Sequence, residues 1–267
     1  MDLDSIAPEL RSAYQLAVDL ARRAGAVQRE HYETELDVRT KSASIDLVTE
    51  VDHECEALIV SGIEAVRPGD AILAEEGGGE NHSRSDWRWI IDPLDGTTNY
   101  AHGFPRFCVS IGVEHEGERR IGVVYDPLLD ELFHCVHAAG AWLGHRRLRV
   151  STQTDLGQAL VATGFAYDVH DSTQDNLARF ARVLKAARGL RRDGSAALDL
   201  CYVASGRLEA YWELKLHAWD VAAGILMVEE AGGRVTSTDG GPAPRSGAEV
   251  VASNGHVHDA ILSHTRG

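Results

Sequence analysis

The chain has 267 residues, of which 44% are hydrophobic and 25% charged, as expected for a globular protein large enough to bury a sizeable core. Its formal net charge of −15 at pH 7 argues against nucleic acid as a partner, and it repels anionic substrates unless bound divalent cations offset the field locally. No apolar run approaches the ~18 residues that span a bilayer, and the acidic N-terminus lacks a secretory signal, so we expect a cytoplasmic protein without a membrane partner.

Two amphipathic helices are predicted in the first quarter of the chain. Apolar side chains recur at three- and four-residue steps from Pro8 to about residue 33, which is the spacing of a helix with one buried face. Thr49 and Asp52 have the spacing of a capping pair, so a second helix is expected to begin there. The Pro-Gly pair at 68–69 ends this helix.

Each of the next two strands ends in a pair of acids. The run 71–74 predicts a short strand that delivers Glu75 and Glu76. The apolar residues 89–91 predict the end of a buried strand, because Pro93 cannot donate a further ladder bond. Two more acids therefore follow the carboxyl end of a strand, where open α/β sheets bind ligands: Asp92 and Asp95.

The acids are followed by a turn and by residues that favour a helix start. Gly96 permits the sharp turn, and the next three residues are candidate caps of a helix whose free N–H groups can bind an anion: Thr97, Thr98 and Asn99. Acids beside an anion site make sense mainly when cations lie between them. Phosphate ester hydrolysis uses that arrangement, and four acids suit Mg²⁺: Glu75, Asp92, Asp95 and Asp220.

The rest of the chain alternates between strands and helices. From Phe107 to about Val150, apolar residues and Gly or Pro breaks predict an antiparallel meander. A helix over 172–187 is expected to bury one stripe of side chains: Leu177, Phe180, Ala181 and Leu184. The other elements are expected as a strand at 158–163, a helix from 194, a strand at 208–214, a helix at 219–231, strands near 235 and 250, and a last helix at 257–262.

This alternation predicts an α/β (α+β) fold. We expect residues 1–267 to form one compact unit with two subdomains, a metal-site half at 1–150 and a substrate half at 151–267. The four cysteines lie in apolar runs without a CxxC pair, so reduced core thiols are favoured over disulfides or zinc ligands: Cys55, Cys108, Cys135 and Cys201.

Single motifs in the second half allow simpler interpretations. The Gly194-Ser195 pair before a helix can present N–H groups to a phosphate, but it is also an ordinary helix cap. Asp220 by itself is better explained as an acid at a helix N-terminus, where it interacts favourably with the helix dipole. Asp193 either pairs with Arg191 or Arg192, or favours a cationic substrate.

Several motifs together resemble the inositol monophosphatase family. Residues 89–105, WIIDPLDGTTNYAHGFP, resemble its first signature, and residues 219–233, WDVAAGILMVEEAGG, resemble its second. Residues 46–49 and 75–76 match two further family positions, and residues 191–197 resemble its phosphate-contact segment. These matches run in the family's order from about residue 41 to residue 233.

The resemblance implies a layered αβαβα sandwich of the sugar-phosphatase type, with two or three Mg²⁺ ions per site, lithium inhibition and a homodimer. It assigns the activating metal to Glu75, Asp92, the carbonyl of Leu94, and Thr97. It assigns the second metal to Asp92, Asp95 and Asp220, and a weaker third one, held through water, to Glu75 and Glu76.

The same resemblance assigns the catalytic and substrate groups. Asp46 and Thr97 would orient and deprotonate the attacking water, with Glu75 as a further catalytic residue. Asp220 and Glu213 would contact the substrate, with Glu213 on the polyol side. Phosphate and substrate hydroxyls would also contact a set of turn residues: Gly96, Thr97, Gly194, Ser195 and Ala196.

The predicted activity is Mg²⁺-dependent hydrolysis of a small polyol or sugar monophosphate, most of all inositol 1-phosphate, by direct attack of metal-activated water. Histidinol-phosphate phosphatase is the first alternative and fructose-1,6-bisphosphatase the second. A catalytically silent protein that binds metal or polyol phosphate is the alternative outside the enzymes.

Overall fold

The computed structural model describes residues 1–77, 79–80 and 85–266, and a large mixed sheet lies at its centre. The strand order of this sheet is β10-β9-β8-β7-β6-β5-β3-β4, in which β3 and β5 are parallel. Its strands are β3 (Ala71–Ala74), β4 (Gly79–Glu80), β5 (Trp87–Asp95), β6 (Cys108–His115), β7 (Glu118–Asp126), β8 (Glu131–Val136), β9 (Gly140–Leu143) and β10 (Arg146–Arg147). The run from β6 to β10 is the predicted antiparallel meander.

A second sheet of five strands is built from the last 110 residues or so of the chain. Its order is β12-β11-β13-β15-β14, with β11 parallel to both of its neighbours. Its strands are β11 (Leu160–Thr163), β12 (Gly189–Arg191), β13 (Ala210–Leu214), β14 (Arg234–Thr236) and β15 (Glu249–Ser253). A separate hairpin near the N-terminus pairs β1 (Val38–Thr40) with β2 (Leu47–Thr49).

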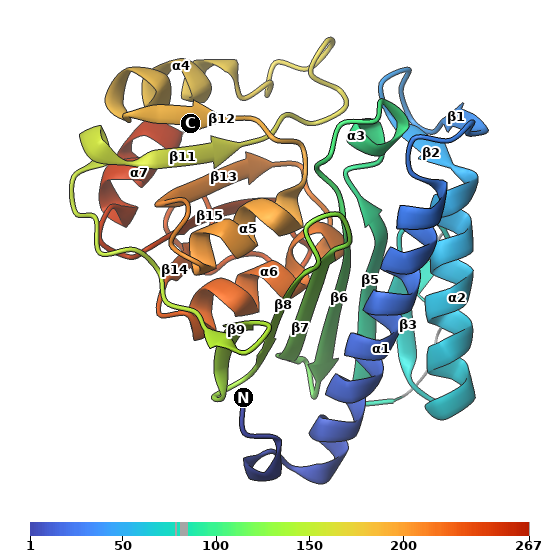
Figure 1. Ribbon diagram of the computed structural model, residues 1–267. Helices are drawn as coiled ribbons and strands as arrows, with labels where there is room; N and C mark the ends of the chain where they lie inside the picture. Colours follow the sequence, from blue (N-terminus) through green and yellow to red (C-terminus); the bar gives the residue numbers. More distant parts are fainter. Residues whose placement is uncertain (78, 81–84, 267) are drawn as a thin grey trace.

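The helices form three layers around the two sheets (Figure 1). α1 (Pro8–His31) and α2 (Glu50–Val66) cover the outer face of the large sheet. α5 (Ala196–Ala204) and α6 (Ala218–Glu230) lie between the sheets, and α4 (Leu177–Ala186) and α7 (His258–Thr265) cover the outer face of the small one. The predicted αβαβα sandwich is confirmed, and the short α3 (Thr97–Ala101) follows β5.

Two glycines let α6 lie directly on the large sheet. A Cβ at Gly112 of β6 would come 2.8 Å from Cβ of Ala222, and one at Gly122 of β7 would come 2.6 Å from the carbonyl oxygen of Ala223. Both distances are shorter than packed side chains allow. This close approach fixes the first turn of α6, and with it Asp220, over the carboxyl end of β5.

The end of β5 and the start of α3, both within residues 89–105, differ from the prediction. β5 does not end before Pro93: its pairing with β6 shifts after Asp92 and resumes at Asp95. The helix cap is Gly96, whose φ of 100° lies in the left-handed region, and Thr97 already belongs to α3. A glycine is favoured here because a side chain at that φ is strained.

The predicted buried stripe of α4 is wrong. Leu177 and Leu184 are 54% and 52% exposed, and the helix begins five residues later than predicted. The face that packs against α7 instead carries Val183 and two arginines, Arg179 and Arg182, which donate hydrogen bonds to carbonyl oxygens at the end of α7. Arginine stems cover apolar surface while their heads bond the helix end, so apolar spacing alone selected the wrong face.

The buried core connects the two halves of the chain. One cluster joins Cys108 and Val124 of the large sheet with Leu200 of α5 and Ala252 of β15. The division into subdomains 1–150 and 151–267 stays a prediction. No helix in the described part of the chain is long and apolar enough to cross a membrane.

Candidate functional site

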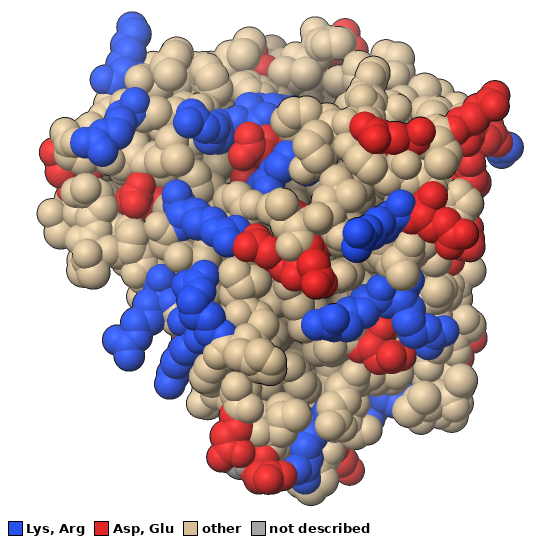
Figure 2. All heavy atoms as spheres, in the orientation of Figure 1, with Lys and Arg blue, Asp and Glu red and all other residues tan. Residues whose placement is uncertain are grey.

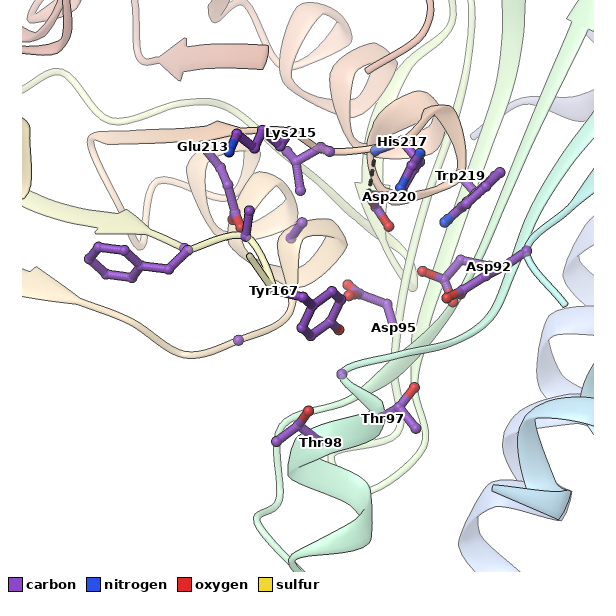
Figure 3. A pocket seen from close by; sticks show the side chains of 18 of the residues that line it. Asp92, Asp95, Thr97, Thr98, Tyr167, Glu213, Lys215, His217, Trp219 and Asp220 are labelled. Carbon is purple, nitrogen blue, oxygen red and sulfur yellow. Dashed lines mark hydrogen bonds between the residues drawn. The ribbon is translucent and has the colours of Figure 1, made fainter. Parts of the chain in front are cut away.

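A cavity of about 220 Å³ opens where the carboxyl end of β5 meets the first turns of α5 and α6. Acids from three separate elements line it, and Figure 3 shows Asp92, Asp95 and Asp220 directed into the same space. Glu75, which follows β3, also lines the cavity and interacts with Asp92. Glu213 of β13 lies on the side of the cavity opposite Asp92 (Figure 3). Pockets for drug-sized ligands have volumes of about 300–1,000 Å³, so this smaller cavity suits a smaller molecule.

The break in the β5 ladder is stabilised by a buried amide from α1. Gln28 Nε2 donates to the carbonyl oxygen of Pro93 at 2.7 Å, and the Leu94 N–H donates to Asp92 Oδ1 at 3.0 Å. These bonds satisfy backbone groups that the irregular ladder leaves unpaired. The two aspartates can therefore occupy one turn at the end of a buried strand.

Asp95 is held by the start of α5. Its Oδ2 accepts hydrogen bonds from Ser195 Oγ at 2.7 Å and from the N–H of Ala197 at 2.8 Å. Burial raises the pKa of Asp95, and these bonds oppose the rise by favouring the carboxylate. The Ser195 hydroxyl is thus bonded to a cavity acid, while Gly194 and Ala196 line the cavity. The predicted contact of this turn's backbone with phosphate stays a prediction.

The cavity acids repel one another. Burial raises the pKa of Asp92 well above its usual value, and the charges of Glu75, Asp95 and Asp220 raise it further. Burial raises the pKa of Asp220 in the same way, although the His217 N–H donates to its Oδ2 at 2.6 Å. Buried carboxylates without enough positive partners are destabilising unless cations bind between them.

A lysine partly compensates this negative charge. Lys41 Nζ lies 2.8 Å from Glu75 Oε1 and also contacts the carboxylate of Glu76. Burial lowers the pKa of Lys41, but the two glutamates outweigh that effect and raise it overall. Among residues 1–77, 79–80 and 85–266, no three His, Cys, Asp or Glu side chains are already drawn together at ligand spacing. The oxygen-only donors nevertheless fit Mg²⁺, which keeps several waters and needs only a few carboxylates.

Thr97 contacts a different aspartate from the one predicted. Its Oγ1 lies 2.8 Å from Asp52 Oδ1 and 3.0 Å from the carbonyl oxygen of Leu94. Asp46 accepts hydrogen bonds from the N–H and hydroxyl of Ser42, and the described structure records none between Asp46 and Thr97. Sequence reasoning had found Asp52 only as the capping partner of Thr49, a role that the structure confirms.

Comparisons with known proteins agree with this geometry. The sequence model of the Inositol monophosphatase family matches residues 9–267. The chain belongs to the inositol monophosphatase family. It is therefore a phosphoric monoester hydrolase, and members of this family are generally metal-dependent.

Individual relatives cover nearly the whole chain. An inositol-1-monophosphatase of Synechocystis sp. is 41% identical over 253 residues, which are 95% of this chain and 88% of the relative. A protein of Vibrio cholerae named Nus factor SuhB is 42% identical and covers 94% of both chains. The solved structure of an inositol monophosphatase from Anabaena (Nostoc) sp. superposes with a TM-score of 0.87 at 40% identity, covering 96% of each chain.

Asp193 does not pair with either of the arginines considered from the sequence. Its Oδ2 lies 4.0 Å from Nη2 of Arg106, and its carbonyl oxygen accepts a 2.8 Å hydrogen bond from Asn99. Asn99 of the first family signature therefore anchors the turn before α5. Asp193 does not belong to the cavity lining, which weakens the argument for a cationic substrate.

His217 lies beside the cavity acids, and the four cysteines are buried thiols. His217 caps α6, and its ring stacks on Trp219 at 4.6 Å between centroids, which places it at the cavity wall beside Asp220. The cysteines are free and buried, as predicted. Burial raises the pKa of Cys108 well above its usual value, so its thiol stays neutral beside Asp95.

Proposed function

We propose that the chain is a Mg²⁺-dependent phosphatase of small polyol or sugar monophosphates, with inositol 1-phosphate as its best substrate. The observation that carries the proposal is the group of buried acids around one small cavity, together with the Thr97–Asp52 hydrogen bond. The acids supply oxygen ligands for cations, and the cations admit a phosphate into a protein of net charge −15. The fold and family support the same reaction.

Two or three Mg²⁺ ions would be held by the residues that the cavity brings together. The first would take Glu75, Asp92, Thr97 and the Leu94 carbonyl, and the second Asp92, Asp95 and Asp220. A third would be served by Glu75 and by Glu76, the next residue in the chain, which lies outside the cavity lining. Bound Mg²⁺ supplies charge neutralisation of the phosphoryl oxygens, activation of water and stabilisation of the leaving oxygen.

The chain's own base is the pair formed by Thr97 and Asp52. The single hydroxyl proton of Thr97 can be donated to Asp52 Oδ1, which leaves the Thr97 oxygen free to accept a proton from the attacking water. Burial raises the pKa of Asp52, which makes its carboxylate a better proton acceptor. Asp46 takes the lesser role of fixing the loop through Ser42.

The substrate is tested by comparing kcat/KM for inositol 1-phosphate, histidinol phosphate and fructose 1,6-bisphosphate. We expect inositol 1-phosphate to exceed the others by at least ~10-fold, because Glu213 offers an acceptor for a polyol hydroxyl and Asp193 faces Arg106. Chelation with EDTA should abolish phosphate release, and added Mg²⁺ should restore it. Release that persists in EDTA contradicts the metal dependence, and no release with any substrate favours a silent binding protein.

Lys41 is expected to compete with Mg²⁺ for Glu75 and Glu76. In Lys41→Met the acids lose their ammonium partner, so we expect the Mg²⁺ concentration for half-maximal thermal stabilisation to fall about 5-fold. Thermal melts across a Mg²⁺ titration measure it, with Lys185→Met on exposed α4 as the control. An unchanged or higher Mg²⁺ requirement contradicts this competition.

Other features implied by the resemblance stay predictions: a homodimer, lithium inhibition and a cytoplasmic location. A role like that of the relatives named Nus factor has less support in this chain than the phosphatase activity. On the described face in Figure 2, basic side chains are interspersed with acidic ones, and the whole chain is strongly acidic, which disfavours direct binding of nucleic acid.

A further inference from the structure

The carboxylate on the polyol side of the cavity is bonded to a buried tyrosine. Tyr211 precedes Glu213 by two residues on β13, so both side chains project from the same face of the sheet. Tyr211 Oη donates to Glu213 Oε2 at 2.6 Å, and the tyrosine side chain is fully buried. A buried phenol cannot exchange its partner with bulk water, so it constrains the position of this carboxylate.

A glycine just after the neighbouring strand leaves room for the Glu213 carboxylate. Gly164 directly follows β11, which lies beside β13 in the sheet. A Cβ built at Gly164 would overlap both oxygens of the Glu213 carboxylate. The backbone of Gly164 is not among those with positive φ, so space for Glu213, rather than turn geometry, accounts for the glycine.

The charge state of Glu213 depends on its surroundings. Its pKa is raised to about 7, because the effect of burial exceeds the opposing effects of the Tyr211 hydrogen bond and the charge of Arg192. The ionisable groups that act on Glu213 or are acted on by it come from several elements around it: Tyr211 on β13, Arg192 before α5, Asp95 on β5, Asp199 on α5 and Asp220 on α6. Loss of the tyrosine hydroxyl therefore favours the protonated acid near neutral pH.

We propose that Tyr211 is a specificity-determining positioning residue, which holds the Glu213 carboxylate as the acceptor for a hydroxyl group of the substrate alcohol. The inference rests on the proposed phosphatase function and deepens it. Tyr211 acts on recognition of the alcohol and not on the phosphoryl group, because it bonds Glu213. Figure 3 shows Glu213 on the opposite side of the cavity from Asp92, the acid that the proposed metal positions share.

The test uses Tyr211→Phe with two substrates that share a phosphoryl group. Inositol 1-phosphate carries ring hydroxyls, and 4-nitrophenyl phosphate carries none. We expect kcat/KM for inositol 1-phosphate to fall about 10-fold, mainly through KM, while kcat/KM for 4-nitrophenyl phosphate changes less than ~2-fold. The pH below which KM for inositol 1-phosphate rises should move upward by about one unit, since the carboxylate has lost a donor.

Further variants separate positioning from a loss of packing. Gly164→Ala keeps the tyrosine hydroxyl but displaces the carboxylate, and it should give the same selective loss for inositol 1-phosphate. Adding Tyr211→Phe to Glu213→Gln should change nothing further, because the tyrosine acts through the glutamate. Tyr125→Phe removes a similar hydroxyl, 2.8 Å from Asp130 and outside the cavity lining, and should leave both substrates unaffected.

Failure of the inference differs from failure of the proposed function. If the wild-type protein prefers inositol 1-phosphate and Tyr211→Phe keeps that preference and its pH profile, the inference is wrong and the function stands. Equal losses for both substrates also overturn it, because they indicate a merely structural role. If the wild-type protein shows no preference for inositol 1-phosphate, the proposed function and the polyol role of Tyr211 are both wrong.

Discussion

Replacement of Asp92 by Asn is expected to lower kcat with inositol 1-phosphate by more than about 100-fold while the protein stays folded. Asp92 is the acid that both proposed metal positions share. Even the outer partners of metal ligands cost 10–100-fold when removed, so loss of a shared ligand should cost more. Steady-state kinetics at saturating Mg²⁺ measure the effect.

The stability of the same variant provides an independent readout. An Asn keeps the oxygen that accepts from the Leu94 N–H, and it removes one charge from a set of mutually repelling acids. Without Mg²⁺ the melting temperature should therefore equal or exceed that of the wild type, whereas the gain in melting temperature on adding Mg²⁺ should shrink.

Asp19→Asn on the exposed face of α1 is the matched control for Asp92→Asn. Within the described residues Asp19 pairs with Arg23 on the same helix, and such an exposed pair contributes little to stability. This variant should match the wild type in both kcat and Mg²⁺ response. A kcat within ~10-fold of wild type for Asp92→Asn would contradict the proposed metal positions.

The sequence predicted those features of the site that depend on local pattern. Continuous apolar residues before an acid placed Asp92 at the carboxyl end of a strand, and spacing identified the capping pair of Thr49 and Asp52. It did not predict that β5 continues through Pro93. The compensating donor is Gln28 of α1, 65 residues away, which no local pattern indicates.

For residues that have two partners, only the partner nearby in the sequence could be predicted. A capping carboxylate has two oxygens, and the second oxygen of Asp52 bonds Thr97, 45 residues later in the chain. Ser195 was predicted to offer its backbone N–H to phosphate because it opens a helix, and its hydroxyl has a further partner, Asp95, that spacing did not indicate. Such partners depend on how the layers pack, and local spacing carries little information about that.

Replacement of Asp52 by Asn tests which aspartate serves Thr97. We expect Asp52→Asn to lower kcat about 100- to 1,000-fold with little change in KM, because the amide can accept the Thr97 hydrogen bond but cannot accept its proton. Asp46→Asn should cost less than ~10-fold, since the Asp46 carboxylate is bonded to Ser42. The opposite ranking of these two variants would restore Asp46 to the role predicted from the sequence.

The capping role of Asp52 requires a control that weakens the helix start without removing the base. Thr49→Ala deletes the hydroxyl that bonds Asp52 Oδ2 and the N–H of Val51, and it should lower the free energy of unfolding by about 1 kcal/mol. Thr97 still bonds Asp52 Oδ1 in this variant, so most of kcat should remain. If Thr49→Ala loses as much kcat as Asp52→Asn at equal stability, the cap alone explains both. If only Asp52→Asn loses kcat, then one carboxylate both starts α2 and accepts the catalytic proton, because its two oxygens face different elements.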